Sequence, residues 1–144
     1  LPQPGAEAVL AALKQRGYRL GVISNSMSSL DIPRSLESFG WNNYFDVVIL
    51  SAFFKRRKPA PEPFLEAARK VNIQPACCAY VGNRVSKDIV GCKLAGFSVG
   101  IVVEWPDRPH PAEQGLTDVP DAVIQSLSSL LKLFPAQSMS AGRG

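Results

Sequence analysis

The stretch YVGNRVSKDIVGCKLAG at residues 80–96 places an amide, Asn83, five residues before an acid, Asp88, around a predicted strand, turn and helix. Two acids at this spacing would suit a metal-assisted phosphate site, because hard cations prefer oxygen ligands. Asn83 can coordinate a cation through its carbonyl oxygen, but it adds no charge. We therefore predict Asn83 and Asp88 as metal ligands that bind Mg²⁺ weakly or not at all. The structural alternatives are a turn residue at 83 and an acid favoured by the helix dipole at 88.

Two further loops carry side chains suited to phosphate. Ser24 and Asn25 offer a hydroxyl and an amide just past a predicted strand, where backbone N–H groups can help them hold a phosphoryl oxygen. Lys58 precedes Pro59, which favours an extended backbone, and its ammonium group can offset charge on a phosphoryl group. We predict Ser24 and Asn25 as substrate-binding residues, and Lys58 with Asp88 as catalytic residues. The alternatives are an ordinary turn and a solvated basic loop.

Strands and helices alternate along the chain, which predicts an α/β fold with a parallel sheet and crossover helices. Ligands of such folds bind beyond the carboxyl ends of the strands, so we expect the three loops to meet there. One domain at residues 1–135 and a flexible tail at 136–144 are predicted. The predicted strands are 19–24, 45–51, 76–82 and 98–103. The predicted helices are one that ends at Gly17 and those at 33–39, 64–71, 86–95 and 120–134.

The net charge of +4 results from 16 Lys and Arg against 12 Asp and Glu in 144 residues. This mild bias, without an aromatic-studded basic stripe, argues against nucleic acid as a partner. No apolar run approaches the length of a membrane span and no secretory leader is visible at the start, so we expect a cytoplasmic protein without a membrane partner. The three cysteines, Cys77, Cys78 and Cys92, are expected to be small buried residues in a reducing compartment.

Taken together, these segments resemble the haloacid dehalogenase superfamily of hydrolases over nearly the whole chain. The most specific segments are KPAPEPF at 58–64 and the turn and helix at 81–96, in this order and spacing. The resemblance implies a Rossmann-like parallel sheet and Mg²⁺-dependent phosphoryl transfer from a small phosphorylated substrate through an aspartyl-phosphate. It also implies roles for single residues. Ser24 matches the hydroxyl that binds the phosphoryl group, Lys58 the lysine that steadies the intermediate, Asn83 the usual metal-binding Asp, and Asp88 the second acid of that motif.

The largest departure from the family pattern is the nucleophile, which in the family lies in an apolar strand followed by Asp-x-Asp. The aspartates of this sequence are Asp31, Asp46, Asp88, Asp107, Asp118 and Asp121, and none follows an apolar strand with that pattern. The chain therefore resembles the C-terminal part of a truncated core, without the N-terminal central strand and without the cap. Because the missing strand lies between those at 19–24 and 76–82 in the family, we expect exposed strand edges and self-association.

Three interpretations of the function stay open at this point. The leading one is a phosphatase-like hydrolase whose chain is inactive alone, because no covalent intermediate forms without a carboxylate nucleophile. A pseudoenzyme that binds a phosphorylated ligand or a protein partner is the first alternative, and a structural interaction module is the second. A true haloacid dehalogenase is a less favoured interpretation. Its chemistry needs no metal ion, so Asn83 would be compatible with it, but it still needs the missing nucleophilic aspartate.

Overall fold

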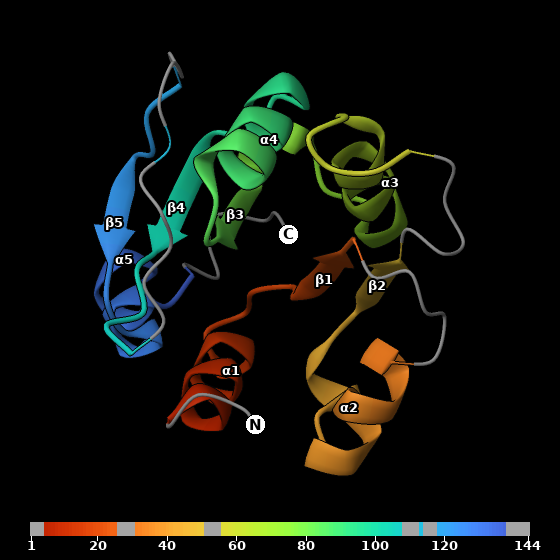
Figure 1. Cartoon of the computed structure of the whole chain (residues 1–144). Coiled ribbons are helices and arrows are strands. Elements are labelled where there is room, and N and C mark those ends of the chain that lie inside the picture. Colours follow the sequence, from red (N-terminus) through yellow and green to blue (C-terminus); the bar gives the residue numbers. More distant parts are fainter. Residues whose placement is uncertain (1–4, 26–30, 51–55, 108–112, 114–117, 138–144) are drawn as a thin grey trace. The chain divides into compact units, whose positions relative to one another are not determined.

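The computed structural model describes residues 5–25, 31–50, 56–107, 113 and 118–137 (Figure 1). The chain divides into two compact units. The first contains residues up to 55 together with those from 127 onward, and the second contains residues 56–126. The predicted boundary at 135 is not tested by this division and stays a prediction. Of the predicted tail, residues 138–144 lie outside the described part of the chain.

The first unit contains a two-stranded parallel sheet in which β1 (Gly21–Ser24) pairs with β2 (Val47–Leu50). Gly21 lies opposite Val47, and Ser24 lies opposite Leu50. The helices of this unit are α1 (Ala6–Gln15), α2 (Asp31–Phe39) and the short α5 (Leu130–Leu133), with 3-10 turns at Asn42–Tyr44 and Leu127–Ser129. The core consists of buried apolar side chains from these helices and from β2: Ala6, Val9, Leu13, Leu36, Val47, Ile49, Leu50 and Leu130.

Polar contacts join the C-terminal segment of the first unit to the residues that follow α1. Arg16 donates through Nη1 to the carbonyl oxygens of Leu131 and Phe134 at 2.7 and 2.8 Å. The Tyr18 hydroxyl donates to the carbonyl oxygen of Pro135 at 2.6 Å, and its ring packs edge-on against that of Phe134. These bonds satisfy carbonyl groups at the end of α5, which have no partner within the helix.

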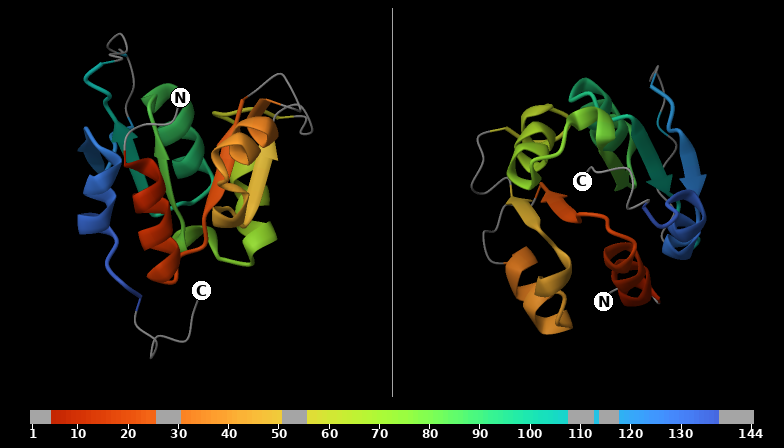
Figure 2. Two further views of the ribbon diagram at one scale, coloured as in Figure 1. Left: turned by 90° about the horizontal axis from the view of Figure 1, so that it is seen from below. Right: turned by 180° about the vertical axis from the view of Figure 1, so that it is seen from behind.

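The second unit contains a three-stranded parallel sheet in the order β3 (Ala79–Gly82), β4 (Val99–Val103) and β5 (Ala122–Ile124) (Figures 1 and 2). Its helices are α3 (Glu62–Val71) and α4 (Val90–Leu94), with a 3-10 turn at Pro75–Cys77 and a π-helical turn at Val85–Ile89. Phe64, Ile89, Cys92 and Ile101 are fully buried and form the centre of its core. Phe64 packs edge-on against Tyr80, with ring centroids 4.8 Å apart.

The parallel α/β architecture predicted from the sequence is confirmed, because the strand pairings among the described residues are parallel and α2, α3 and α4 alternate with β1 to β4 along the chain. Gly17, Gly40 and Gly96 follow α1, α2 and α4 with φ of 96°, 72° and 89°. This left-handed conformation explains why glycine ends those helices. Among the described strands, β1 and β3 are each terminal strands of their sheets. No helix in the described part of the chain is long and apolar enough to cross a membrane.

Three sequence predictions are wrong in part. The helix predicted at 120–134 is a strand at Ala122–Ile124 followed by a 3-10 turn and the short α5, because pairing with β4 overrides the helical pattern. The strand predicted at 76–82 begins only at Ala79. Cys77 therefore lies in a 3-10 turn and is exposed, and Cys78 is half-buried. Only Cys92 is buried as expected, and burial raises the pKa of its thiol to about 11.

Candidate active site

A buried ion pair joins Lys58 to Asp88 in the second unit. Lys58 Nζ lies 2.6 Å from Asp88 Oδ1, and the two side chains are only 12% and 3% exposed. Lys58 comes from the segment before α3, and Asp88 from the π-helical turn that follows β3. The pair thus lies just beyond the carboxyl end of β3, where ligands bind in parallel α/β sheets.

Tyr80 of β3 is a third member of this cluster. Lys58 Nζ donates to the Tyr80 hydroxyl at 3.1 Å and lies 5.4 Å from the centroid of its ring. Burial alone would lower the pKa of Lys58, but the charges and hydrogen bonds of Tyr80 and Asp88 outweigh it and raise that pKa. Lys58 is therefore held as a cation. Sequence reasoning missed Tyr80, although the two-residue period of a strand places it on the same face as Gly82.

The second carboxylate oxygen of Asp88 holds the turn after β3. Asp88 Oδ2 accepts the backbone N–H of Asn83 at 2.9 Å and that of Arg84 at 3.1 Å. Gly82 makes this approach possible, because a Cβ atom there would lie 2.3 Å from Asp88 Oδ2. Asp88 therefore binds Lys58 through Oδ1 and two backbone amides of the turn through Oδ2.

Glu113, from the loop between β4 and β5, contacts the next two residues of the same turn. Its Oε1 accepts the Val85 N–H at 2.6 Å and its Oε2 accepts the Ser86 N–H at 3.0 Å. Burial alone would raise the pKa of Glu113, but the hydrogen bonds from Ser86 and Val85 outweigh it and lower that pKa. Sequence reasoning missed Glu113, because it lies 27 residues beyond Ser86 in a Pro-rich loop without periodicity.

The residues predicted from the sequence fall into two groups. Lys58, Asn83 and Asp88 lie together in the second unit, joined by the bonds described above. Ser24 is the last residue of β1 in the first unit, and Asn25 follows it. Both groups therefore lie at carboxyl ends of parallel strands. Their meeting in one site, and the role of each residue, stay predictions.

The described residues do not present a magnesium site. Among them, no group of three or more His, Cys, Asp or Glu side chains is placed to hold a metal ion. Both oxygens of Asp88 are already engaged, one by Lys58 and the other by two backbone amides. Asn83 adds only a neutral amide oxygen. Because Mg²⁺ is bound in proteins through carboxylates, this donor set does not fit the ion.

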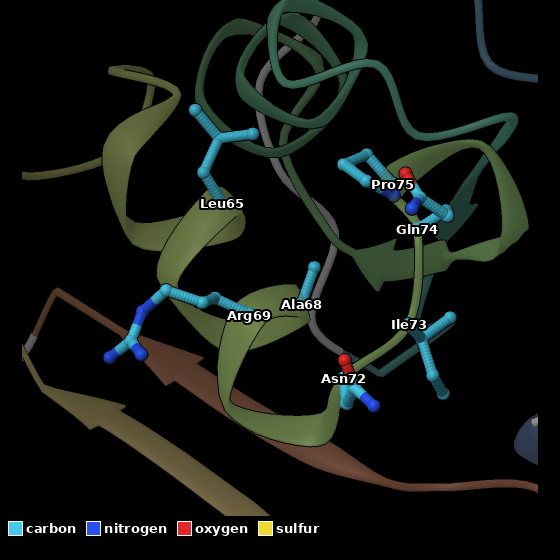
Figure 3. Close-up of a pocket in the computed structure, with 7 residues that line it drawn as sticks. All are labelled: Leu65, Ala68, Arg69, Asn72, Ile73, Gln74 and Pro75. Atoms are coloured by element: carbon cyan, nitrogen blue, oxygen red, sulfur yellow. The ribbon is translucent and has the colours of Figure 1, made fainter.

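A hollow of about 240 Å³ lies elsewhere on the second unit, against the second half of α3 and the turn after it (Figure 3). Its lining includes Leu65, Arg69, Gln74 and Pro75. Arg69 is the only charged side chain of the lining, and it is paired with Glu66 at 2.7 Å. The hollow thus holds no group suited to catalysis, in contrast to the Lys58–Asp88 cluster.

Comparison with known proteins identifies the family. Residues 1–96 match the model of the haloacid dehalogenase-like hydrolases. The chain belongs to this family. The match includes Ser24, Lys58, Asn83 and Asp88 and confirms the resemblance that these positions indicated.

The relatives of this haloacid dehalogenase-like chain include named phosphatases. It is 34% identical over 136 residues to the glyceraldehyde 3-phosphate phosphatase of Methanothermobacter thermautotrophicus, covering 92% of this chain and 58% of that protein. It is 33% identical over 132 residues to a phosphoglycolate phosphatase of Cupriavidus necator, covering 91% and 54%. The structure of a haloacid dehalogenase-family phosphatase from Thermococcus onnurineus superposes with a TM-score of 0.79 at 26% identity, covering 94% and 59%. The chain thus spans little more than half the length of these relatives.

Proposed function

We propose that this chain supplies the lysine and the aspartate of a site that hydrolyses small phosphomonoesters. The observation that carries the proposal is the buried Lys58–Asp88 pair beyond the carboxyl end of β3. Two relatives of the chain are named as phosphatases of small phosphorylated molecules, which supports the same substrate class.

Each residue has a distinct part in this proposal. Lys58, held as a cation, offsets the negative charge that develops on the phosphoryl group during transfer. Asp88 orients Lys58 through Oδ1 and so acts as its positioning partner. Ser24 and Asn25 bind phosphoryl oxygens through the hydroxyl and amide groups that follow β1. The substrate is a small phosphorylated molecule in a cytoplasmic pool.

The proposal also requires a carboxylate nucleophile that these 144 residues do not contain. None of the six aspartates follows an apolar strand as Asp-x-Asp. Hydrolysis through a covalent intermediate needs such a group, so we expect this chain to be inactive alone. The family implies Mg²⁺, and we expect its binding by this chain to be weak or absent because position 83 is an amide.

The test compares the 144-residue chain with the intact protein purified from its own cells, using glyceraldehyde 3-phosphate and phosphoglycolate as substrates. We expect phosphate release only from the intact protein. There, Lys58→Ala should lower kcat by about a hundredfold or more. Lys70→Ala, which removes another lysine of the same unit from α3, is the matched control and should leave kcat unchanged. Turnover by the Asn83→Asp variant of the 144-residue chain would contradict the need for a missing nucleophile.

Asn83 favours one second function, the binding of a phosphorylated ligand without turnover. A neutral amide in place of a metal-binding acid leaves the phosphate contacts in place, while it weakens the binding of the metal ion. On this alternative the intact protein binds inorganic phosphate in the absence of Mg²⁺, Lys58→Ala abolishes that binding, and no substrate is hydrolysed.

Self-association is a further property that we propose for the chain. The observation behind it is the strand order, in which β1 and β3 are terminal strands of the described sheets. Terminal strands are templates for pairing with another chain. Sedimentation velocity at rising protein concentration should show dimers or larger species. A strict monomer with a sharp, reversible thermal transition would contradict this expectation.

A further inference from the structure

The turn after β3 is held by two carboxylates that divide four successive backbone amides between them. Asp88 accepts the N–H groups of residues 83 and 84, and Glu113 accepts those of residues 85 and 86. Asp88 belongs to the same helical segment, whereas Glu113 comes from the distant loop between β4 and β5. These four amides thus each donate to a carboxylate.

Asp88 and Glu113 each stabilise a different part of the turn. N–H groups in the first turn of a helical segment have no partner within it, and so need acceptors from outside. Hydrogen bonds to a charged acceptor are about twice as strong as those between neutral groups. Arg84 belongs to the same turn, and its Nε is 3.7 Å from Glu113 Oε1, so its positive charge favours the ionised form of Glu113. Glu113 therefore fixes the half of the turn that Asp88 does not reach.

We infer that Glu113 is a positioning residue of the candidate active site, because its carboxylate fixes the turn that carries Asn83 and Asp88. The inference rests on the proposed function only for its catalytic consequence. The clamp, by which we mean the hydrogen bonds from the Val85 and Ser86 amides to Glu113, does not depend on it. Releasing Val85 and Ser86 frees the residues between Asn83 and Asp88. The Asp88 carboxylate then loses its fixed approach to Gly82, and with it the fixed position of Lys58.

The first experiment measures hydrogen exchange and the side-chain NMR signal of Lys58 Nζ in the 144-residue chain. Glu113→Ala should speed exchange of the Val85 and Ser86 amides by about tenfold or more, and should shift the Lys58 signal. Glu113→Gln is sharper, because glutamine keeps one acceptor and replaces the other by a donor. It should keep slow exchange at one of the two amides only. Glu66→Ala, which removes another ion-paired carboxylate from the same unit, is the matched control and should change neither signal.

The second experiment separates this inference from the proposed function. In the intact protein, Glu113→Ala should lower kcat by about tenfold, and Glu113→Gln by less, whereas Lys58→Ala lowers it by about a hundredfold or more. If the wild-type protein hydrolyses no phosphomonoester, the proposed function fails. The hydrogen-exchange and Lys58 NMR measurements still decide whether Glu113 holds the turn. Unchanged exchange at Val85 and Ser86 would overturn the clamp. Faster exchange with an unchanged Lys58 signal would overturn the positioning role.

Discussion

Two lysine–aspartate pairs in the second unit have the same length but different surroundings. Lys58 Nζ lies 2.6 Å from Asp88, and Lys93 Nζ lies 2.6 Å from Asp121. Both carboxylates also accept backbone N–H groups, which for Asp121 is the N–H of Gly100 at 2.7 Å. The side chains of the first pair are 12% and 3% exposed, whereas those of the second are 28% and 44% exposed. Bond length therefore does not distinguish the candidate site from a surface ion pair.

The two pairs also lie at opposite ends of the sheet. Asp121 immediately precedes β5 and bonds to Gly100 near the start of β4, so its pair fastens the amino ends of two strands. Asp88 follows β3, beyond the carboxyl end. Ligands of parallel α/β sheets bind at carboxyl ends. Strand end and burial together mark the Lys58–Asp88 pair as the one suited to chemistry.

Removing the lysine from each pair gives the largest expected difference between them. Lys58→Met leaves a buried aspartate without its counter-charge, and we expect it to lower the free energy of unfolding by about 3–5 kcal/mol. Lys93→Met exposes its aspartate to water and should cost below about 1 kcal/mol. Urea denaturation of both variants, followed by a probe in the second unit, measures the two values. Equal losses would mean that burial does not separate the pairs.

Adding a methyl group at Gly82 should disturb only the buried pair. A Cβ atom there would lie 2.3 Å from Asp88 Oδ2, so the carboxylate must leave its two amides. We expect Gly82→Ala to cost about 1–3 kcal/mol, the range for overpacking in a close-packed interior.

The control for the Gly82 prediction is a double-mutant cycle with Asp88→Ala. With the carboxylate removed, the methyl group still meets the Cβ atom of residue 88 at 2.5 Å but no longer displaces a carboxylate from its amides. Gly82→Ala should therefore cost less in that background than in the wild type. The same cost in both backgrounds would show that the glycine serves the strand rather than the aspartate.

Much of this site could be predicted from the sequence, because its parts lie next to recognisable elements. Lys58 precedes a proline-rich helix start, and Asp88 lies in the first turn after a strand. Local pattern places such residues at strand ends, and the parallel topology then brings neighbouring loops together. The family membership confirms the resemblance that this order and spacing indicated, and the roles of the single residues stay predictions.

The remainder could not be predicted, because it depends on contacts distant in sequence. Glu113 contacts Val85 and Ser86 from the segment between β4 and β5, and the sequence around it has no periodic pattern that predicts such a contact. Residues 120–134 have an amphipathic helical pattern, but pairing with β4 makes Ala122–Ile124 a strand. The hydrogen bonds of a sheet come from another segment, so propensity within the segment does not decide its conformation.

The smallest expected effect is the pH dependence of stability that the exposed Lys93–Asp121 pair contributes. The hydrogen bond from Lys93 and that from the Gly100 N–H lower the pKa of Asp121 from its ordinary 3.8. A carboxyl whose pKa is lowered in the folded state stabilises that state above its unfolded pKa, and the stabilisation is lost as pH falls through the folded value. Asp121→Asn should therefore be less stable than the wild type near pH 6, by below about 1 kcal/mol.

That deficit should shrink as the pH falls below the ordinary 3.8 and through the lowered pKa of Asp121 in the folded state, where position 121 becomes neutral in both chains. The quantity to follow is the difference between the two chains in urea denaturation, since Asp46 and Glu113 also have lowered pKa values and make both chains acid-sensitive. A deficit that stayed constant with pH would mean that Asp121 acts through the shape of its hydrogen bonds and not through its charge. The Lys93–Asp121 pair would then stabilise the fold only as neutral hydrogen bonds do. Of the two pairs, charge would then contribute only to Lys58–Asp88.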